Sequence, residues 1–234
     1  MPVSILTRTP FLIGAALLEN GRDYNSAVLL DRKGSVLNIY RKKYLIPFSE
    51  YLPLKGYLNF LRDTFHFNIY DFRPGMGPGI FTLSTQGQTA PFPIKGGIVI
   101  CSEEAYPHLF RSLKNHKAGF VMTLLNDGWF NQEAALILHA QNAIMRAVEN
   151  SIPIVRVANT GWSCLIDQHG TVTSLLKDQP LLNTAAYGVF PVPLVYRETI
   201  YGRWGDIFAV LCVCFVIINH FANLWRGIRT WTRG

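Results

Sequence analysis

The sequence predicts an α/β domain followed by one long apolar helix. Over residues 97–158, short runs rich in β-branched residues alternate with amphipathic stretches, which is typical of a sheet covered by helices. Of the 234 residues, 49% are hydrophobic and 16% are charged, so the chain can build a sizeable core and is neither disordered nor a coiled coil. Apolar residues are concentrated over 204–225.

Three adjacent strands are expected near the N-terminus. Apolar residues 11–18 run into a polar turn, a second apolar run covers 26–30, and a third strand over 35–40 follows a turn at 31–34. The tight turns predict an antiparallel meander. Residues 11–18 are too short for a signal peptide and lack a small-residue cleavage site, so we interpret them as a core strand.

Two segments lack the pattern of a regular element. Residues 41–60 contain Pro47 and Pro53, which interrupt helices and strands, so a loop is predicted. Residues 74–93 are rich in Gly, Pro, Gln and Thr, which predicts an exposed loop or insertion.

The pattern then changes to strands separated by helices. Tyr106, Leu109, Phe110 and Leu113 recur at helical spacing, and Pro107 fits the opening turn of that helix. In order, the expected elements are a strand over 97–101, this helix, a strand over 118–125, a helix over 132–150, a strand over 153–158 and a hairpin over 163–175.

Residues 204–225 are predicted as a transmembrane helix, followed by a basic tail over 226–234. A span needs about 20 mostly apolar residues. This segment has an apolar centre over 207–218, with Trp204 and Trp225 at its ends. The alternative is a buried helix of a soluble protein, which the short centre also allows.

Three arginines in the basic tail favour a cytoplasmic C-terminus, which would place residues 1–203 on the other side of the membrane. Arg197 and Arg203 on the opposite flank weaken this orientation.

The net charge of +7 does not indicate nucleic-acid binding, because the 22 Lys and Arg residues are scattered without a stripe or a known motif. The cysteines, which are Cys101, Cys164, Cys212 and Cys214, form neither a disulfide framework nor a zinc spacing. We expect no nucleic-acid partner, no metal and no cofactor.

Cys101 is the candidate nucleophile on position alone. It ends an apolar strand and directly precedes a helix, so its sulfur would lie at the carboxyl edge of the sheet beside free backbone N–H groups. Such groups stabilise a thiolate and an oxyanion, and a nucleophile elbow has the same strand-turn-helix context. The alternative is an inert core cysteine.

Lys42 is the candidate cation of the site. It follows a strand and precedes the proline-containing loop, and its charge can stabilise a tetrahedral intermediate. Glu50, Glu103 and Glu104 are candidate bases or orienting groups. The alternative for each of these residues is an ordinary surface charge.

Five segments resemble the nitrilase superfamily and, more closely, its membrane branch, the apolipoprotein N-acyltransferases. They cover residues 40–53, 96–111, 124–130, 139–170 and 201–206, in the order that the family has them. The resemblance implies a nitrilase-like α-β-β-α sandwich over residues 1–200, incomplete at its N-terminus, ahead of the transmembrane helix.

The resemblance also implies roles for individual residues. The family nucleophile falls on Cys101, and the catalytic lysine falls on Lys42, which stands eight residues before the loop glutamate Glu50. Glu50 and Glu103 match glutamates that help to order the site. The family commonly has Tyr after the nucleophile, where this chain has Ser102.

The implied activity is transfer of an acyl chain from a phospholipid to the N-terminal amine of a diacylglyceryl-cysteine apolipoprotein, through a thioester on the cysteine. The implied location is a bacterial inner membrane, with the nitrilase-like domain on the extracytoplasmic side. Two alternatives remain open, a soluble nitrilase-like amidase and a non-catalytic remnant or partner subunit.

One departure from the family is an absence. The family's general-base glutamate lies well upstream of the lysine, whereas residues 1–41 contain only Glu19, whose turn context and short distance do not match. The family's upstream membrane helices are also missing. We therefore expect the chain to be the carboxyl-terminal part of such an enzyme, inactive alone or completed by a separate N-terminal half.

Overall fold

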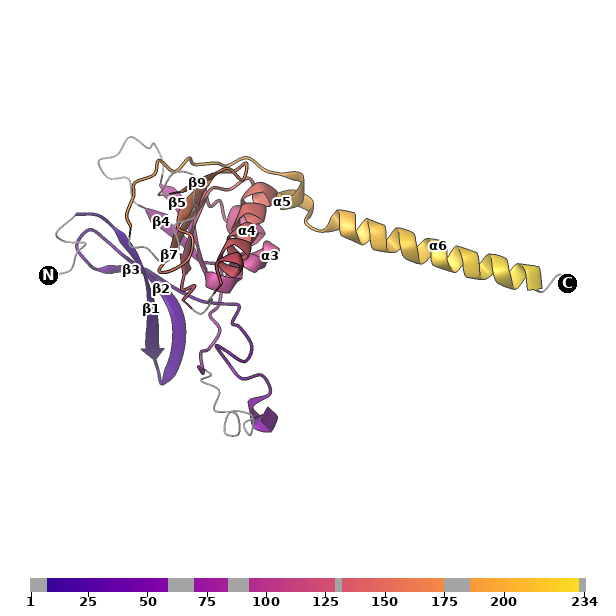
Figure 1. Cartoon of the computed structure of the whole chain (residues 1–234), viewed down its shortest axis with the longest axis horizontal. Helices are drawn as coiled ribbons and strands as arrows, with labels where there is room; N and C mark the ends of the chain where they lie inside the picture. The colour runs from indigo at the N-terminus through magenta and orange to yellow at the C-terminus, as the bar shows by residue number, and fades with distance from the viewer. Residues whose placement is uncertain (1–7, 59–69, 84–92, 129–131, 175–185, 232–234) are drawn as a thin grey trace.

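The computed structural model describes residues 8–58, 70–83, 93–128, 132–174 and 186–231. Two β-sheets lie against each other, helices cover the outer face of the larger sheet, and a long helix projects away from this domain (Figure 1).

The smaller sheet is the predicted meander. Strands β1 (Phe11–Glu19), β2 (Arg22–Leu30) and β3 (Val36–Arg41) pair antiparallel in the order β1-β2-β3. Asn20 and Gly21 turn the chain between β1 and β2 with positive φ angles of 51° and 71°, a conformation that Asn and Gly tolerate best. The prediction of three antiparallel strands is confirmed.

The larger sheet has the strand order β4-β5-β6-β7-β8-β9. Its central strands β5, β6 and β7 are parallel, and the outer ones pair antiparallel. The strand bounds are β4 Ile80–Leu83, β5 Ile94–Ile100, β6 Phe120–Leu125, β7 Ile154–Ala158, β8 Cys164–Ile166 and β9 Val172–Ser174.

Strand β4 corrects the prediction of a loop over 74–93. Its residue Phe81 is almost fully buried, and the ring lies over Gly96 of β5, where an added Cβ would come within 2.3 Å of it. A four-residue strand within a Gly- and Pro-rich segment has no detectable period, so only this packing against β5 reveals it.

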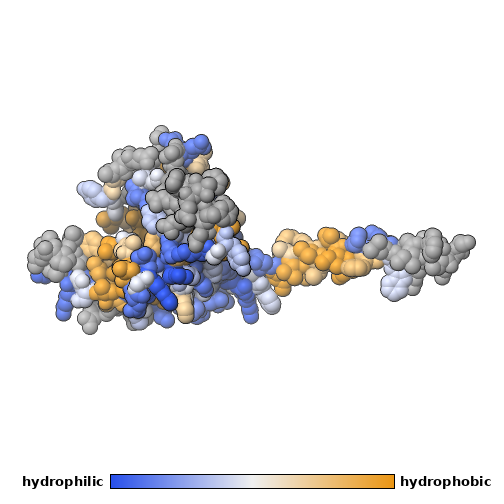
Figure 2. Space-filling view, turned by 90° about the horizontal axis from the view of Figure 1, so that it is seen from below, coloured by the Kyte–Doolittle hydropathy of each residue, from blue (hydrophilic) through white to orange (hydrophobic). Residues whose placement is uncertain are grey.

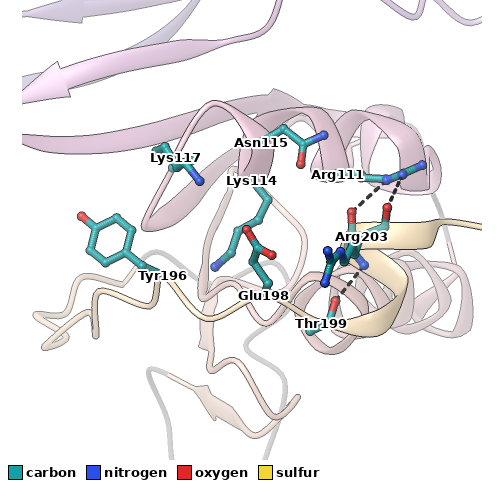
Figure 3. Close-up of a pocket in the computed structure, with 10 residues that line it drawn as sticks. Arg111, Lys114, Asn115, Lys117, Tyr196, Glu198, Thr199 and Arg203 are labelled. Carbon is teal, nitrogen blue, oxygen red and sulfur yellow. Dashed lines mark hydrogen bonds between the residues drawn. The ribbon is translucent and has the colours of Figure 1, made fainter.

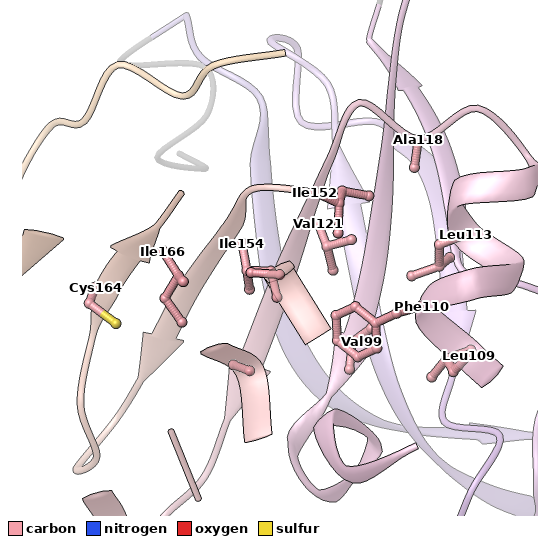
Figure 4. Close-up of a cluster of buried hydrophobic side chains, with 12 residues drawn as sticks. Val99, Leu109, Phe110, Leu113, Ala118, Val121, Ile152, Ile154, Cys164 and Ile166 are labelled. Carbon is pink, nitrogen blue, oxygen red and sulfur yellow. The ribbon is translucent and has the colours of Figure 1, made fainter. Parts of the chain in front are cut away.

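Helices cover one face of the larger sheet. They are η1 (Cys101–Ala105), α3 (Pro107–Asn115) and α4 (Glu133–Asn150), with Pro107 in the first turn of α3 as expected. Phe110 and Leu113 of α3 are fully buried against Val99, Val121 and Ile154 of the sheet (Figure 4). This burial of apolar area fixes β5 and the residue that follows it.

The other face of the larger sheet packs against the meander. Ala27 and Tyr40 of the meander share a buried cluster with Phe81, Ile98 and Ile100 of the larger sheet. The described residues therefore form helix, sheet and sheet layers, which supports the nitrilase-like α/β class.

After an extended segment, helices α5 (Ile200–Trp204) and α6 (Ile207–Trp231) end the described chain. Helix α6 projects away from the domain (Figure 1), and apolar side chains gather on the part of it nearer the domain (Figure 2). Phe208, for example, is 77% exposed. A helix is present where one was predicted. Within the described ranges, however, no helix is both long and apolar enough to cross a bilayer, so the predicted span over 204–225 is not confirmed.

Candidate active site

Cys101 lies at the carboxyl end of β5, where the chain turns into η1. Its φ angle is +49°, a conformation that costs a non-glycine residue energy and occurs where a site holds the backbone in place. Backbone hydrogen bonds from Ser102 and Asn126 reach the thiol. The predicted position at a strand end and helix start is confirmed, although the first helix is a single 3-10 turn.

Lys42 directly follows β3 and is buried, with 1% of its surface exposed. Its ammonium Nζ lies 2.7 Å from Oε2 of Glu50. The proline-containing loop returns Glu50 to the lysine, and the same carboxylate accepts hydrogen bonds from Asn25 Nδ2 at 2.7 Å and from the Ile46 N–H at 2.8 Å. Lys42 and Glu50, eight residues apart in the sequence, therefore form a buried ion pair.

The charge of Lys42 acts on Cys101 across the site. Burial raises the pKa of the Cys101 thiol, and the nearby Lys42 ammonium lowers it without cancelling the effect of burial. In the described structure Cys101 is thus a thiol at neutral pH, and attack on an acyl carbon requires a group that accepts its proton.

Glu103 connects the lysine segment to the cysteine turn. The carboxylate is fully buried, and its burial raises the pKa of Glu103. It accepts hydrogen bonds from the Tyr40 hydroxyl at 2.9 Å and from the backbone N–H groups of Lys43 at 2.8 Å, Tyr44 at 3.1 Å and Ile100 at 2.9 Å. One side chain therefore fixes the ends of β3 and β5 relative to each other.

A second polar cluster lies beside the thiol, and no sequence pattern predicts most of its residues. Donor atoms of Cys101, Asp127 and His139 all lie within 4.8 Å of one another. Asp127 Oδ1 is 2.9 Å from His139 Nδ1, and Glu104 pairs with Arg156 at 3.0 Å and lies 3.6 Å from His139 Nε2. Glu104, a candidate base in the sequence, is thus a partner of Arg156.

The charged side chains of this cluster are buried, and the positive charge of Arg156 lies beside the carboxylates of Glu104 and Asp127. Asp127 and Arg156 also approach each other at 3.6 Å, and Oδ2 of Asp127 has no hydrogen-bond partner. Gly161 leaves the room for this oxygen, because an added Cβ there would lie 2.0 Å from it. Nitrogen, oxygen and sulfur donors can hold a thiophilic metal, but the contact between Asp127 and His139 already pairs two of the three donors.

The position of Asp127 just after a predicted strand is a sequence signal that could have identified it as a site residue. Asp127 follows the end of β6 by two residues, at the same sheet edge as Cys101 after β5, because these two strands are parallel. His139 gives no such signal, since its position depends on how α4 packs.

Glu19 lies at the end of β1 and forms an ion pair with Arg41, with Arg41 Nη2 2.7 Å from Glu19 Oε1. Side chains of consecutive residues at a strand end point to opposite faces, so this pair lies away from Lys42. The contact agrees with the sequence argument that Glu19 does not serve the site.

The carbon-nitrogen hydrolase family matches residues 7–186, which include the three strand ends that carry Lys42, Cys101 and Asp127. The chain belongs to this family. The match covers both sheets and the helices over them.

Curated relatives of the chain are named apolipoprotein N-acyltransferases. Apolipoprotein N-acyltransferase 2 of Treponema denticola is 30% identical over 227 residues, which cover 94% of this chain and 41% of that protein. The enzyme of Geobacter metallireducens is 35% identical over 190 residues, covering 81% of this chain and 34% of that protein. The chain thus spans less than half the length of these relatives.

Solved structures share the fold. An amidase mutant of the nitrilase superfamily from Nesterenkonia AN1 has a TM-score of 0.53 at 18% identity, covering 76% of this chain and 61% of that one. A carbon-nitrogen hydrolase from Helicobacter pylori G27 has a TM-score of 0.52 at 17% identity, covering 73% and 58%.

Proposed function

We propose that the chain carries the cysteine site of an apolipoprotein N-acyltransferase. The observation that carries the proposal is the buried ion pair of Lys42 with Glu50. The Lys42 ammonium lowers the pKa of the Cys101 thiol, and Cys101 lies at the end of a strand with a positive φ angle. The names of the relatives, at 30% and 35% identity, supply the reaction class.

In the first step, Sγ of Cys101 attacks the ester carbonyl carbon of a phospholipid. The Lys42 ammonium and backbone N–H groups stabilise the negative charge on the carbonyl oxygen. The carbon–oxygen bond of the ester then breaks, the lysophospholipid leaves with a proton on its hydroxyl, and a thioester on Cys101 remains.

In the second step, the free amine of a diacylglyceryl-cysteine apolipoprotein attacks the thioester carbon. An amide bond forms, the carbon–sulfur bond breaks, and the thiol of Cys101 is regenerated. Glu50 orients Lys42 in both steps, and Glu103 holds the turn of Cys101 in place.

Proton transfer is the demanding part of this scheme. Near the site, each described glutamate already has a partner, since Glu50 bonds Lys42, Glu103 bonds backbone N–H groups and Glu104 bonds Arg156. The charge of Asp127 raises the pKa of Cys101. We therefore expect the purified chain not to turn over a diacylglyceryl peptide unless a separate polypeptide supplies the base.

Helix α6 supports a membrane location. Phe208, Leu211 and Phe215 are each at least 60% exposed, and such an apolar helix surface is stable in contact with lipid. We propose that residues 204–225 anchor the chain at a bacterial inner membrane, with the domain outside and the C-terminus in the cytoplasm. Carbonate-washed membranes should retain the full chain and release one that ends at Asp206.

Acylation of Cys101 tests the proposed function directly. The chain is incubated with a p-nitrophenyl acyl ester, whose good leaving group makes attack possible without an optimal base, and the intact mass is measured. The wild type is expected to gain one acyl group on the peptide that contains Cys101, and Cys101→Ala none. Turnover of a diacylglyceryl peptide by the chain alone would instead show that a residue of this chain accepts the proton.

The second candidate is hydrolysis of an amide by the same cysteine, as in the amidases that share the fold. Transfer and hydrolysis differ in what releases the acyl group. An acylated chain that passes its acyl group to water as fast as to a diacylglyceryl peptide would favour the amidase.

A further inference from the structure

A pocket of about 300 Å³ lies at the sheet edge opposite to Cys101. It is formed by the end of α3, the turn that leads into β6 and the segment that leads into and forms α5 (Figure 3). Because β5 and β6 are parallel, the start of β6 and the end of β5 occupy opposite edges of the sheet. The pocket is thus separate from the candidate active site.

The lining of this cationic pocket is strongly positive. Four cations face one carboxylate, that of Glu198; the cations are Arg111, Lys114, Lys117 and Arg203. An uncompensated positive charge of this size in a concave site attracts anions.

The two inner cations are held by carbonyl oxygens rather than by carboxylates. Lys114 is buried and donates to Ser151 O at 3.0 Å and Val195 O at 2.7 Å, and its burial lowers the pKa of the ammonium to about 8. Arg111 donates to the carbonyls of Gly202 at 2.9 Å and Arg203 at 2.8 Å. A cation that is bonded to neutral carbonyl oxygens can form a stronger, charge-assisted hydrogen bond with an anion that enters the pocket.

The two outer cations are exposed and available. The ammonium of Lys117 makes no hydrogen bond or ion pair with the residues that the structure describes, although the backbone N–H of Lys117 donates to Lys114 O at 2.9 Å. The guanidinium of Arg203 lies over the ring of Trp204, 5.9 Å from its centre. Both can turn toward a ligand at the mouth of the pocket.

The pocket adjoins the point where α6 leaves the domain. Arg203 belongs to α5, which ends three residues before α6 begins, and Arg111 packs so closely on Gly205 that an added Cβ there would lie 2.4 Å from Nη1. An anion in the pocket is therefore next to the exposed apolar surface of α6.

We propose that the cationic pocket binds a phosphate group. The anion of a phospholipid headgroup suits the place best, because its acyl chains could lie along α6 while the phosphate sits among the cations. A free phosphate-bearing solute offers the same chemistry. The proposal concerns neither Cys101 nor the acyl donor that it attacks.

Native mass spectrometry of the full chain in a neutral maltoside detergent tests the proposal with added phosphatidylglycerol as the probe. The pocket variant is Lys117→Gln/Arg203→Gln, and the matched control is Arg32→Gln/Lys33→Gln, which removes two exposed cations from the turn between β2 and β3. Wild type and control are expected to retain a lipid. Loss of two cations should weaken retention in the pocket variant by about thirtyfold.

Calorimetric titration with inorganic phosphate separates the two sources. If the pocket variant retains less lipid than the control, the ligand is a phospholipid headgroup. If no variant retains lipid but the pocket variant binds inorganic phosphate more weakly than the control, the ligand is a free phosphate-bearing solute. Equal behaviour of the pocket variant and the control, in both measurements, would overturn the proposal. Alkylation of Cys101 by iodoacetamide is expected to be unchanged in the pocket variant, so a failure here is distinct from a failure of the acyltransferase proposal.

Discussion

Buried cations have different partners at the two edges of the larger sheet that the ends of its parallel central strands form. At the edge of Cys101, buried cations meet carboxylates, Lys42 with Glu50 at 2.7 Å and Arg156 with Glu104 at 3.0 Å. At the edge of the cationic pocket, the hydrogen-bond partners of Lys114 among the described residues are carbonyl oxygens. Paired charges hold a geometry without any ligand, whereas uncompensated charges leave attraction for a ligand.

The largest effect is expected at the paired edge, from Glu103→Ala. The substitution leaves the Tyr40 hydroxyl and the backbone N–H groups of Lys43 and Ile100 without an acceptor, which should cost about 3 kcal/mol or more of unfolding free energy. Urea unfolding followed by circular dichroism measures the loss. Glu133→Ala, at an exposed position in the first turn of α4, is the control and should lower the midpoint far less, because only a helix-dipole interaction is lost. A Glu103 variant as stable as this control would show that the paired edge does not depend on its carboxylate.

The next largest effect is expected from Lys42→Met. The Lys42 charge lowers the pKa of Cys101, so its removal should raise that pKa further and slow alkylation of Cys101 at pH 8 by about tenfold or more. Peptide mass spectrometry after iodoacetamide treatment gives the rate for each cysteine. Lys43→Met is the matched control, because Lys43 is the adjacent cation and is exposed. Equal slowing by both variants would argue against a specific role of Lys42.

Asp127→Asn should act in the opposite direction and more weakly. The Asp127 carboxylate raises the pKa of Cys101, so removal of its charge should speed alkylation at pH 8 by about threefold. The same rate assay measures the effect, with Asp31→Asn in the exposed turn before β3 as the control. Slower alkylation in Asp127→Asn would mean that the carboxylate assists thiolate formation instead.

At the other end of the sheet, beside the cationic pocket, the effect expected is a change in the pH dependence of stability. Because burial lowers the pKa of Lys114 to about 8 from an ordinary value of 10.5, the unfolded chain holds a proton between these pH values that the folded chain has lost. Lys114 should therefore make stability rise with pH from about 8 to 10.5. The slope of the urea midpoint against pH across this range should be less positive in Lys114→Met than in the wild type. Equal slopes of the urea midpoint against pH in the wild type and in Lys114→Met would show that Lys114 does not cause this pH dependence.

Local patterns predicted the elements that position the site. The antiparallel meander, the strand that ends at Cys101 and the helix that opens at Pro107 each have a period or a turn signal within a few residues. Strand β4 lacks such a signal, because its pairing with β5 depends on residues that are distant in sequence.

The site residues divide in the same way. Lys42 and Glu50 are selected through the family resemblance, from their spacing of eight residues, and the structure adds that the two side chains form an ion pair. Asp127 and His139 meet only because α4 packs beside the end of β6, and Arg156 reaches Glu104 from 52 residues away. Buried charge networks of this kind are decided by tertiary packing, which no local pattern contains.

Tandem mass spectrometry of the acylated chain tests the central claim most directly. After treatment with a p-nitrophenyl acyl ester, the acyl group is assigned among Cys101, Cys164, Cys212 and Cys214, in wild type and in Lys42→Met. The account predicts an adduct on Cys101 that is reduced in Lys42→Met, even though Cys212 and Cys214 are more exposed. Acylation confined to Cys212 and Cys214, or equal on Cys101 with and without Lys42, would contradict it.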